Sequence, residues 1–372
     1  MSHLYTLLDA PAIETPALVF YPDVIRRNVA QVVEMAGGPD RLRPHAKTHK
    51  TREITKLQLA AGVTKHKCAT IAEAEMLLSC GVPDVILAYP AIGPNAVRLA
   101  RLAKQYSTAF VSSLIDSEAG ASMLSKAAVE LGVTLGFLVD LDVGQHRTGI
   151  VPDRAAALYC LAAGLPGLKP NGLHAYDGHN RSESRAERDA MAAESLRTVA
   201  TVRSQIESAG VSVPRIVSGG TPGFPSYAAI RNVPGLECSP GTYVLHDSGY
   251  GNSYPDLTGV TPAAVVLTRV ISKPTANRVT FDIGTKAVAS DPPAGKRLVL
   301  LEQPDAVAVG HNEEHYIVEV PNPDRWQIGD FAYAVPIHIC PTVALYREAL
   351  TAEGGRITGQ WSIVARDRKL TI

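Results

Sequence analysis

Two hydrophobic patterns alternate along the first two thirds of the chain. Short runs rich in Val, Ile and Leu are typical of buried strands, and Ala- and Leu-rich stretches with helical spacing separate them. Nearly continuous apolar strands between helices indicate parallel βαβ units. The predicted strands are 18–21, 42–47, 67–70, 85–89, 109–113, 136–142, 172–176, 215–219 and 237–239, and the predicted helices are 24–35, 51–61, 71–80, 94–105, 118–131, 152–163 and 185–209.

Eight of these strands lie between residues 42 and 240, which is the number in a (β/α)8 barrel. The strand at 18–21 is surplus to that number and is free to join another domain. A doubly wound sheet is the alternative fold for this part of the chain, because periodicity alone does not close a barrel.

The pattern changes after about residue 255, where turns with Gly, Pro and Asn separate short strands and little helix is predicted. Such a pattern is typical of an antiparallel β domain. The predicted strands here are 263–272, 278–282, 297–302, 315–320, 331–335 and 360–365. We therefore expect an α/β barrel over residues 16–250 and a β domain built from residues 1–15 and 251–372.

Composition excludes several classes of protein. Hydrophobic residues make up 46% of the 372-residue chain and charged residues 19%, which favours a globular protein over a disordered one. The 36 basic and 36 acidic residues give no net charge, so a nucleic-acid partner is not expected. No apolar run reaches the ~18–20 residues that a membrane helix needs, and no signal peptide is recognised. Five scattered cysteines without a CxxC pair indicate reduced thiols and a cytoplasmic location.

The segment RPHAKTHK, residues 43–50, places several cationic side chains at the C-terminal end of a predicted barrel strand. That end of a barrel carries the active site. Burying an unpaired charge costs several kcal/mol, so a lysine there indicates a function. Nearby cations and desolvation favour a neutral amine that can form a Schiff base. Lys47, which ends the strand, is a better candidate than Lys50. A solvated basic loop is the alternative.

This segment is followed in order by KCATIAEAE, DVGQHRTG, GLHAYDGH, VSGGTP, CSPGTY and HICPT. Together these motifs resemble the D-threonine aldolase and D-serine dehydratase family, which are alanine-racemase-like enzymes that use pyridoxal 5'-phosphate (PLP). The resemblance extends from about residue 15 to the C-terminus. It implies a PLP-binding barrel followed by a β domain, assembled as a homodimer, and it implies that Lys47 forms the Schiff base with PLP.

Glycine-rich turns after strands are candidates to bind the phosphate of PLP, because their backbone N–H groups can point at an anion. In barrels this pocket is often built after the seventh and eighth strands. Ordinary turns between strands and helices are the alternative. The residues that fit are Ser218, Gly219, Gly220 and Thr221 after the seventh predicted strand, and Gly241, Thr242 and Tyr243 after the eighth.

Arg147 follows the strand at 136–142, where a fixed guanidinium could donate to the phenolate oxygen of PLP. A salt bridge to Asp140 or Asp142 is the alternative. Tyr176, at the end of the strand at 172–176, could line the pocket or act as an acid or base. His174 alternates with it and could belong to the core.

His338 and Cys340 follow the predicted strand 331–335. Positions i and i+2 of a strand share a face, so the two side chains could hold one ion, and imidazole plus thiolate suits zinc. A buried histidine near a free cysteine is the alternative. The resemblance implies a divalent ion here, zinc or manganese, that contacts the β-hydroxyl of the substrate. His-x-Cys is the pattern of the dehydratase branch, whereas aldolases have His-x-Asp. His179 is a candidate base or metal contact, or a solvent-facing loop residue.

The resemblance therefore implies a lyase that acts on D-β-hydroxy-α-amino acids. We predict cleavage of the D-threonine aldolase type, which yields glycine and an aldehyde. The alternatives are a D-serine dehydratase, which yields pyruvate and ammonia, a related D-3-hydroxyamino-acid dehydratase, and a PLP-binding protein without turnover. A racemase is disfavoured because racemases need no metal pair. The sequence does not place a base over the β-hydroxyl rather than over the Cα proton, so aldolase and dehydratase both stay open.

Overall fold

The computed structural model describes residues 2–372, with side chains from residue 4 onward, as two compact units. The barrel unit comprises residues 32–47, 55–241 and 367–372, and the β unit comprises the chain up to residue 31 together with 48–54 and 242–366. The domain bounds 16–250 for the barrel, and 1–15 with 251–372 for the β domain, stay predictions. No helix among the described residues is long and apolar enough to cross a membrane.

Seven parallel strands form the sheet of the barrel unit, in the order in which they follow one another along the chain. Residues 42–45 close this sheet. Leu42 forms a parallel bridge to Cys238 of the last strand, and His45 forms one to Lys67 of the first. The predicted barrel is therefore confirmed, although residues 42–47 do not form a regular strand. The strands are β2 (Lys65–Cys68), β3 (Asp84–Pro90), β4 (Phe110–Ile115), β5 (Leu135–Asp140), β6 (Leu168–Ala175), β7 (Ile216–Ser218) and β8 (Leu236–Cys238).

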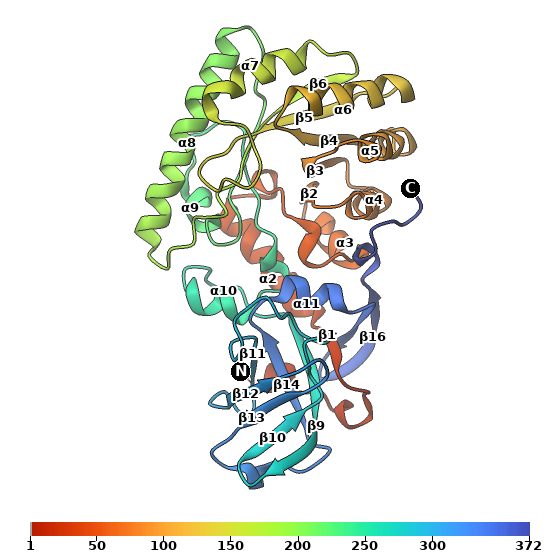
Figure 1. Cartoon of the computed structure of the whole chain (residues 1–372), viewed down its shortest axis with the longest axis vertical. Coiled ribbons are helices and arrows are strands. Elements are labelled where there is room, and N and C mark those ends of the chain that lie inside the picture. Colours follow the sequence, from red (N-terminus) through yellow and green to blue (C-terminus); the bar gives the residue numbers. More distant parts are fainter. Residues whose placement is uncertain (1) are drawn as a thin grey trace. The chain divides into compact units, whose positions relative to one another are not determined.

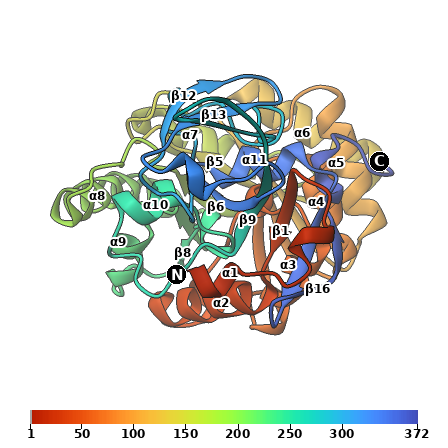
Figure 2. The same cartoon turned by 90° about the horizontal axis from the view of Figure 1, so that it is seen from below.

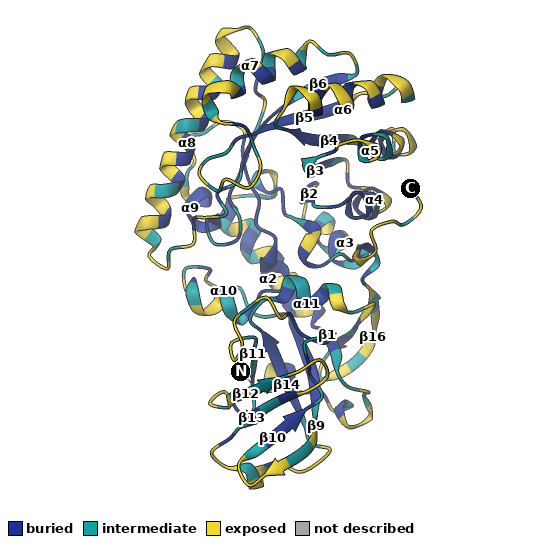
Figure 3. Cartoon of the chain, in the orientation of Figure 1, coloured by how far each residue is buried: buried dark blue, intermediate teal, exposed yellow. Residues whose placement is uncertain are grey.

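Helices lie outside these strands (Figure 1), and their outer sides carry the exposed residues whereas the strands are mostly buried (Figure 3). Local capping fixes where helices begin. The side chain of Thr70 accepts a hydrogen bond from the amide of Glu73, and the Glu73 carboxylate accepts one from the amide of Ala69, so both amides have partners where this helix begins. The helices are α2 (Pro22–Ala36), α3 (Arg52–Ala60), α4 (Ile71–Ser79), α5 (Pro94–Gln105), α6 (Glu118–Leu131), α7 (Pro152–Ala163), α8 (Arg185–Ser208) and α9 (Phe224–Ala229).

The β unit is built on a mixed sheet, with the path β12-β13-β10-β9-β1-β15-β16 and with β14 paired to β9 and β11. The surplus strand β1 (Ala17–Phe20) joins this sheet, where it pairs antiparallel with β9 and parallel with β15. Figure 2 shows β1 beside β9. The expected antiparallel domain has one parallel pairing, β1 with β15, because an N-terminal segment inserts between two C-terminal strands.

The remaining strands of this sheet are β9 (Ala264–Thr275), β10 (Arg278–Phe281), β11 (Leu298–Leu300), β12 (Val307–His311), β13 (Tyr316–Glu319), β14 (Phe331–Pro336), β15 (Glu348–Glu353) and β16 (Arg356–Ser362). Three short helices accompany them, α1 (Ser2–Tyr5), α10 (Ser248–Ser253) and α11 (Ile339–Leu345). The pairings other than that of β1 with β15 are antiparallel, as the turn-rich sequence predicts.

A fully buried arginine holds the closing segment of the barrel in place. The two terminal nitrogens of Arg43 donate to the two carboxylate oxygens of Asp84 in β3, at 2.8 and 2.9 Å, and its Nε donates to Glu237 in β8 at 2.6 Å. Burial raises the pKa of Asp84, but Arg43 and then Arg215 outweigh this effect and hold the pKa below its ordinary value. Arg43 therefore ties residues 42–45 to strands on both sides.

We expect Arg43→Ala to destabilise the barrel unit by about 3–5 kcal/mol, because it leaves two carboxylates without their buried partner. The matched control is Arg197→Ala, which removes an exposed arginine of α8 that contacts Glu194. That control should lose less than about 1 kcal/mol. Urea unfolding followed by circular dichroism measures both values. Equal small losses would contradict a structural role for the buried pair.

Candidate active site in the barrel and metal motif in the β unit

Lys47 lies where the closing segment of the barrel ends. The segment is hydrogen-bonded on both sides, from the amide of His45 to the carbonyl of Pro240 at 3.1 Å and from the amide of Lys67 to the carbonyl of Pro44 at 2.9 Å. The chain then turns into a 3-10 helix, Ala46–Thr48, and the side chain of Lys47 is exposed. Because residues 42–45 run parallel to their neighbours, Lys47 follows the C-terminal edge of the barrel, where barrel enzymes carry their sites.

Arg147 lies over the ring of Tyr176, with 5.0 Å between the guanidinium carbon and the ring centroid. Throughout residues 2–372 it forms no ion pair with Asp140 or Asp142, which was the alternative left open by the sequence. Asp142 is instead paired with His146 at 2.7 Å. The aromatic face steadies the guanidinium without using its N–H donors. Arg147 is therefore suited to bind an anionic oxygen of a ligand.

The turns after β7 and β8 are tied to each other. The amide of Ser239 donates to the carbonyl of Ser218 at 3.1 Å, and the amide of Gly241 donates to the hydroxyl of Thr221 at 3.2 Å. The structure thus brings Ser218, Thr221 and Gly241 together, as expected for a pocket built by the last two strands.

Close packing requires glycine in the first of these turns. Gly219 has a φ of +76°, and a Cβ at Gly220 would lie 2.9 Å from Cε2 of Tyr176. The hydroxyl of Ser218 is buried without a hydrogen-bond partner in the described chain, and within the same residues the amides of Gly219 and Gly220 donate no hydrogen bond. Unfilled donors beside a glycine cradle fit a bound phosphate.

Thr242 and Tyr243 are both buried, in a 3-10 helix over Thr242–Val244 that belongs to the β unit. The hydroxyl of Thr242 lies 3.5 Å from the sulfur of Cys340. Thr242 therefore lies beside the predicted metal motif. His179 is exposed in the loop after β6, where its Nε2 would lie 3.1 Å from a Cβ at Gly144.

A buried lysine inside the barrel was not predicted from the sequence. Lys67 of β2 is 2% exposed, and its Nζ lies 3.4 Å from Nε2 of His174 in β6. Nδ1 of His174 donates to Asp140 of β5 at 2.6 Å. Burial, and then the charge of Lys47, lower the pKa of Lys67 to about 7. The signal was available, because KHKC places two basic residues in a buried strand, which is the argument that identified Lys47.

His338 and Cys340 do not share the face of a strand, so that part of the prediction is wrong. β14 ends at Pro336, and Cys340 lies in the first turn of α11. The buried carboxylate of Asp247 accepts a hydrogen bond from the amide of Ile339 at 3.0 Å, which favours a helix start where the sequence suggested an extended chain.

The two side chains nevertheless interact electrostatically, and Nδ1 of His338 donates to Asp291 at 2.5 Å. Burial lowers the pKa of His338, but Cys340 and then Asp291 outweigh it and raise the pKa to about 9. Cys340 and Asp291 thus favour a positive charge at the His338 imidazole, and the same surroundings would favour a bound cation. Thr48, which follows Lys47 in the chain, lies with its hydroxyl 3.1 Å from the sulfur of Cys340.

Within residues 2–372 no three His, Cys, Asp or Glu side chains are arranged as a ready metal site. His338 and Cys340 would therefore supply two ligands, and water or substrate would complete the coordination of a zinc ion. Because Nδ1 of His338 is engaged by Asp291, its Nε2 is the nitrogen that suits a metal.

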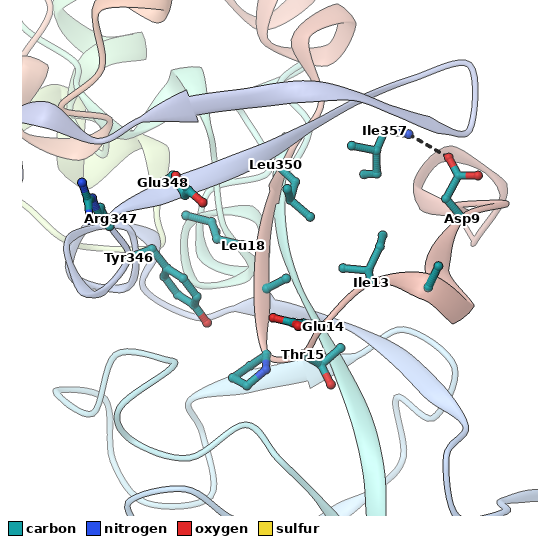
Figure 4. Close-up of a pocket in the computed structure, with 13 residues that line it drawn as sticks. Asp9, Ile13, Glu14, Thr15, Leu18, Tyr346, Arg347, Glu348, Leu350 and Ile357 are labelled. Carbon is teal, nitrogen blue, oxygen red and sulfur yellow. Dashed lines mark hydrogen bonds between the residues drawn. The ribbon is translucent and has the colours of Figure 1, made fainter.

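A cavity of about 650 Å³ in the β unit contains none of the predicted site residues. Leu18 of β1 and Leu350 of β15 line it, together with Tyr346 (Figure 4). At its rim the amide of Ile357 donates to Asp9 at 3.2 Å. The predicted chemistry does not depend on this cavity.

Two family models match the chain. One, described as the N-terminal domain of alanine racemase, matches residues 22–245, and the other, described as a putative serine dehydratase domain, matches residues 263–352. A D-threonine aldolase from Arthrobacter sp is 31% identical over 361 residues, which cover 95% of this chain and 93% of that protein. A D-threo-3-hydroxyaspartate dehydratase from Delftia sp. is 26% identical and covers 92% and 95%.

Solved structures match over nearly the whole length. The crystal structure of a D-threonine aldolase from Filomicrobium marinum superimposes with a TM-score of 0.87 at 26% identity and covers 98% of each chain. Two structures of a D-threo-3-hydroxyaspartate dehydratase match the fold with TM-scores of 0.84 and 0.83 at 23% identity. They are variants in which a histidine, or a cysteine two positions after it, is replaced by alanine, and the cysteine variant is a metal-free form.

Proposed function

Because the chain belongs to the D-threonine aldolase and D-serine dehydratase family of lyases, we propose that it cleaves D-β-hydroxy-α-amino acids with the help of PLP and a divalent metal ion. The reaction that we favour is retro-aldol cleavage to glycine and an aldehyde. The observation that carries this choice is the match of 95% of the chain to a D-threonine aldolase at 31% identity.

The residues of the barrel edge fit PLP. Lys47 would hold the cofactor covalently, the turn of Ser218, Gly219 and Gly220 would bind its phosphate, and Arg147 would donate to its phenolate oxygen. When bound, PLP supplies an electron sink for the bond that breaks at Cα of the substrate.

The protein's own groups have to hold the substrate and move protons. The cationic edge at Lys47 and Arg147 favours a substrate that carries a carboxylate. A base must take the proton of the β-hydroxyl for aldol cleavage, and Tyr176 and His179 are the candidates. An ion held by His338 and Cys340 would lower the pKa of that hydroxyl as a Lewis acid.

Dehydration is the second candidate function, and the His338–Cys340 pair favours it. The matched dehydratase also has a histidine and a cysteine two positions apart, and its cysteine variant is a metal-free form. In this reaction a base takes the Cα proton and the hydroxyl leaves as water. The predicted homodimer and cytoplasmic location stay predictions.

The test is to incubate protein loaded with PLP and zinc or manganese with D-threonine and with D-serine, and to assay separately for glycine plus aldehyde and for 2-keto acid. We expect glycine and acetaldehyde from D-threonine, and turnover of L-threonine at least 100-fold lower, on the order of 3 kcal/mol of discrimination. A 2-keto acid without glycine would replace the aldolase by the dehydratase. Equal turnover of both enantiomers would contradict the assignment to D-amino acids.

We expect Lys47→Ala to abolish the visible absorbance of bound PLP and the lyase activity, because the amine that holds the cofactor is gone. Lys56→Ala, at an exposed position of α3, is the control and should keep both. Borohydride reduction followed by peptide mass spectrometry identifies the labelled lysine. A reduced adduct on Lys67 in the unchanged protein would show that Lys47 is not the cofactor lysine.

We expect His338→Ala and Cys340→Ala to lose the bound divalent ion and most lyase activity while PLP stays bound, because the two groups are held by different residues. His315→Ala, an exposed histidine of the β unit, is the control and should keep the metal. Metal content is measured by mass spectrometry and PLP by absorbance. Full activity after verified removal of the metal would rule out its role in the reaction.

A further inference from the structure

Lys67 is a buried amine whose hydrogen-bonding capacity the protein leaves mostly unused. Its side chain is 2% exposed, and in the described chain Nζ has one hydrogen-bond partner, Nε2 of His174 at 3.4 Å. A lysine ammonium carries three N–H donors. Burying a cation with unfilled donors costs several kcal/mol unless a further partner arrives. Lys67 can therefore donate hydrogen bonds to an acceptor atom of a bound ligand.

The partner that the protein does provide gives the amine a fixed direction. Burial lowers the pKa of His174, so its ring is neutral and has one donor and one acceptor. Nδ1 donates to Asp140, hence Nε2 accepts from Lys67. The hydroxyl of Thr148 donates to the other oxygen of Asp140 at 2.9 Å. The carboxylate of Asp140 therefore orients the amine through a neutral ring.

Lys67 shares its surroundings with the residues that fit PLP. Its Nζ lies 5.5 Å from the centroid of the Tyr176 ring, and Arg147 lies over the same ring. The edge of that ring packs against Gly220 of the phosphate turn. The charged or titratable groups around Lys67 are Arg43 and Lys47 from the closing segment, Asp140 from β5, Arg147 from the following loop, and His174 and Tyr176 at the end of β6.

In this set, Asp140 is the one carboxylate. The charge of Arg43 is already balanced by Asp84 and Glu237. Lys47, Lys67 and Arg147 therefore remain as cations that face Asp140 alone. Such an excess of positive charge calls for an anion, and bound PLP carries both a phosphate and a phenolate oxygen. An anion bound beside Lys67 raises the pKa of its amine, so the ligand itself favours the ammonium form, whose unfilled donors can then supply a hydrogen bond to that ligand. A lysine whose role was only structural would have its donors filled by protein carbonyls or carboxylates.

We propose that Lys67 is a positioning residue of this site, whose ammonium donates to the bound cofactor and places a positive charge beside the bond between the cofactor and Lys47. The inference rests on the proposed function, because it takes Lys47 as the cofactor lysine. It has two measurable consequences. The extra donor strengthens cofactor binding, and the extra charge disfavours protonation of the nitrogen that joins Lys47 to the cofactor.

The test compares PLP-loaded proteins that carry Lys67→Met, Lys67→Gln or Lys67→Arg. The first two remove the charge at similar length, and the third keeps it. We expect the pH midpoint of the visible absorption band to rise by about one unit in the Met and Gln variants, and to stay near the wild-type value in the Arg variant. We expect the dissociation constant of PLP to rise roughly tenfold in the Met and Gln variants, the effect of losing one charged hydrogen bond.

Lys65→Met is the matched control on the same strand. Lys65 binds Glu237 at 2.8 Å, so its loss should lower the thermal unfolding temperature without moving the pH midpoint. An unmoved midpoint and an unchanged PLP affinity in Lys67→Met, with the Lys47 adduct intact, would overturn the inference. If Lys67→Met does not fold, Lys67→Gln decides by the same criteria.

Reduced peptides from each protein separate this inference from the proposed function. A missing adduct in the wild-type protein would mean that the proposed function fails. An adduct on Lys67 instead of Lys47 would overturn both the cofactor lysine and the positioning role. An adduct on Lys47 in every protein, with the midpoint raised in the uncharged variants, supports the inference.

Discussion

A single buried guanidinium determines where the barrel closes. Residues 42–45 pair with β8 and β2 through isolated bridges and a few backbone hydrogen bonds rather than as a regular strand. Arg43 compensates by binding carboxylates on strands to either side, with no exposure of its own side chain. A buried ion pair of this kind adds little net stability, but it selects one geometry. Any other register of residues 42–45 against β8 and β2 would leave a buried charge without its partner. The position of Lys47 depends on these ion pairs of Arg43, because Lys47 directly follows the segment that they hold.

Much of this architecture follows from the sequence, because it depends on hydrophobic periodicity. The barrel strands and the change to turn-rich β structure are visible as patterns, and so is the surplus strand that became β1. The parallel pairing of β1 with β15 was not predictable, because it joins segments over 300 residues apart and depends on tertiary packing. The irregular closing segment was also missed, since its order comes from Arg43 rather than from strand propensity.

The candidate site shows the same division. Lys47, Arg147 and the glycine turns were predicted because charged or glycine residues at strand ends are unusual enough to require a function. The pairing of His338 with Cys340 was expected for the wrong geometric reason, since Asp247 promotes a helix start there. The basic residues of the buried strand KHKC could have drawn attention to Lys67, but its partners His174 and Asp140 come from strands distant in sequence and could not be predicted.

The ring of Tyr176 has a consequence for how this protein can evolve. It supports a guanidinium and an ammonium, and its edge occupies the space that a side chain at residue 220 would need. A smaller residue at 176 would release both cations, and a larger residue at 220 would displace the ring. Positions 67, 147, 176 and 220 are thus coupled through one ring, so the effects of substitutions at these positions on stability or binding do not add.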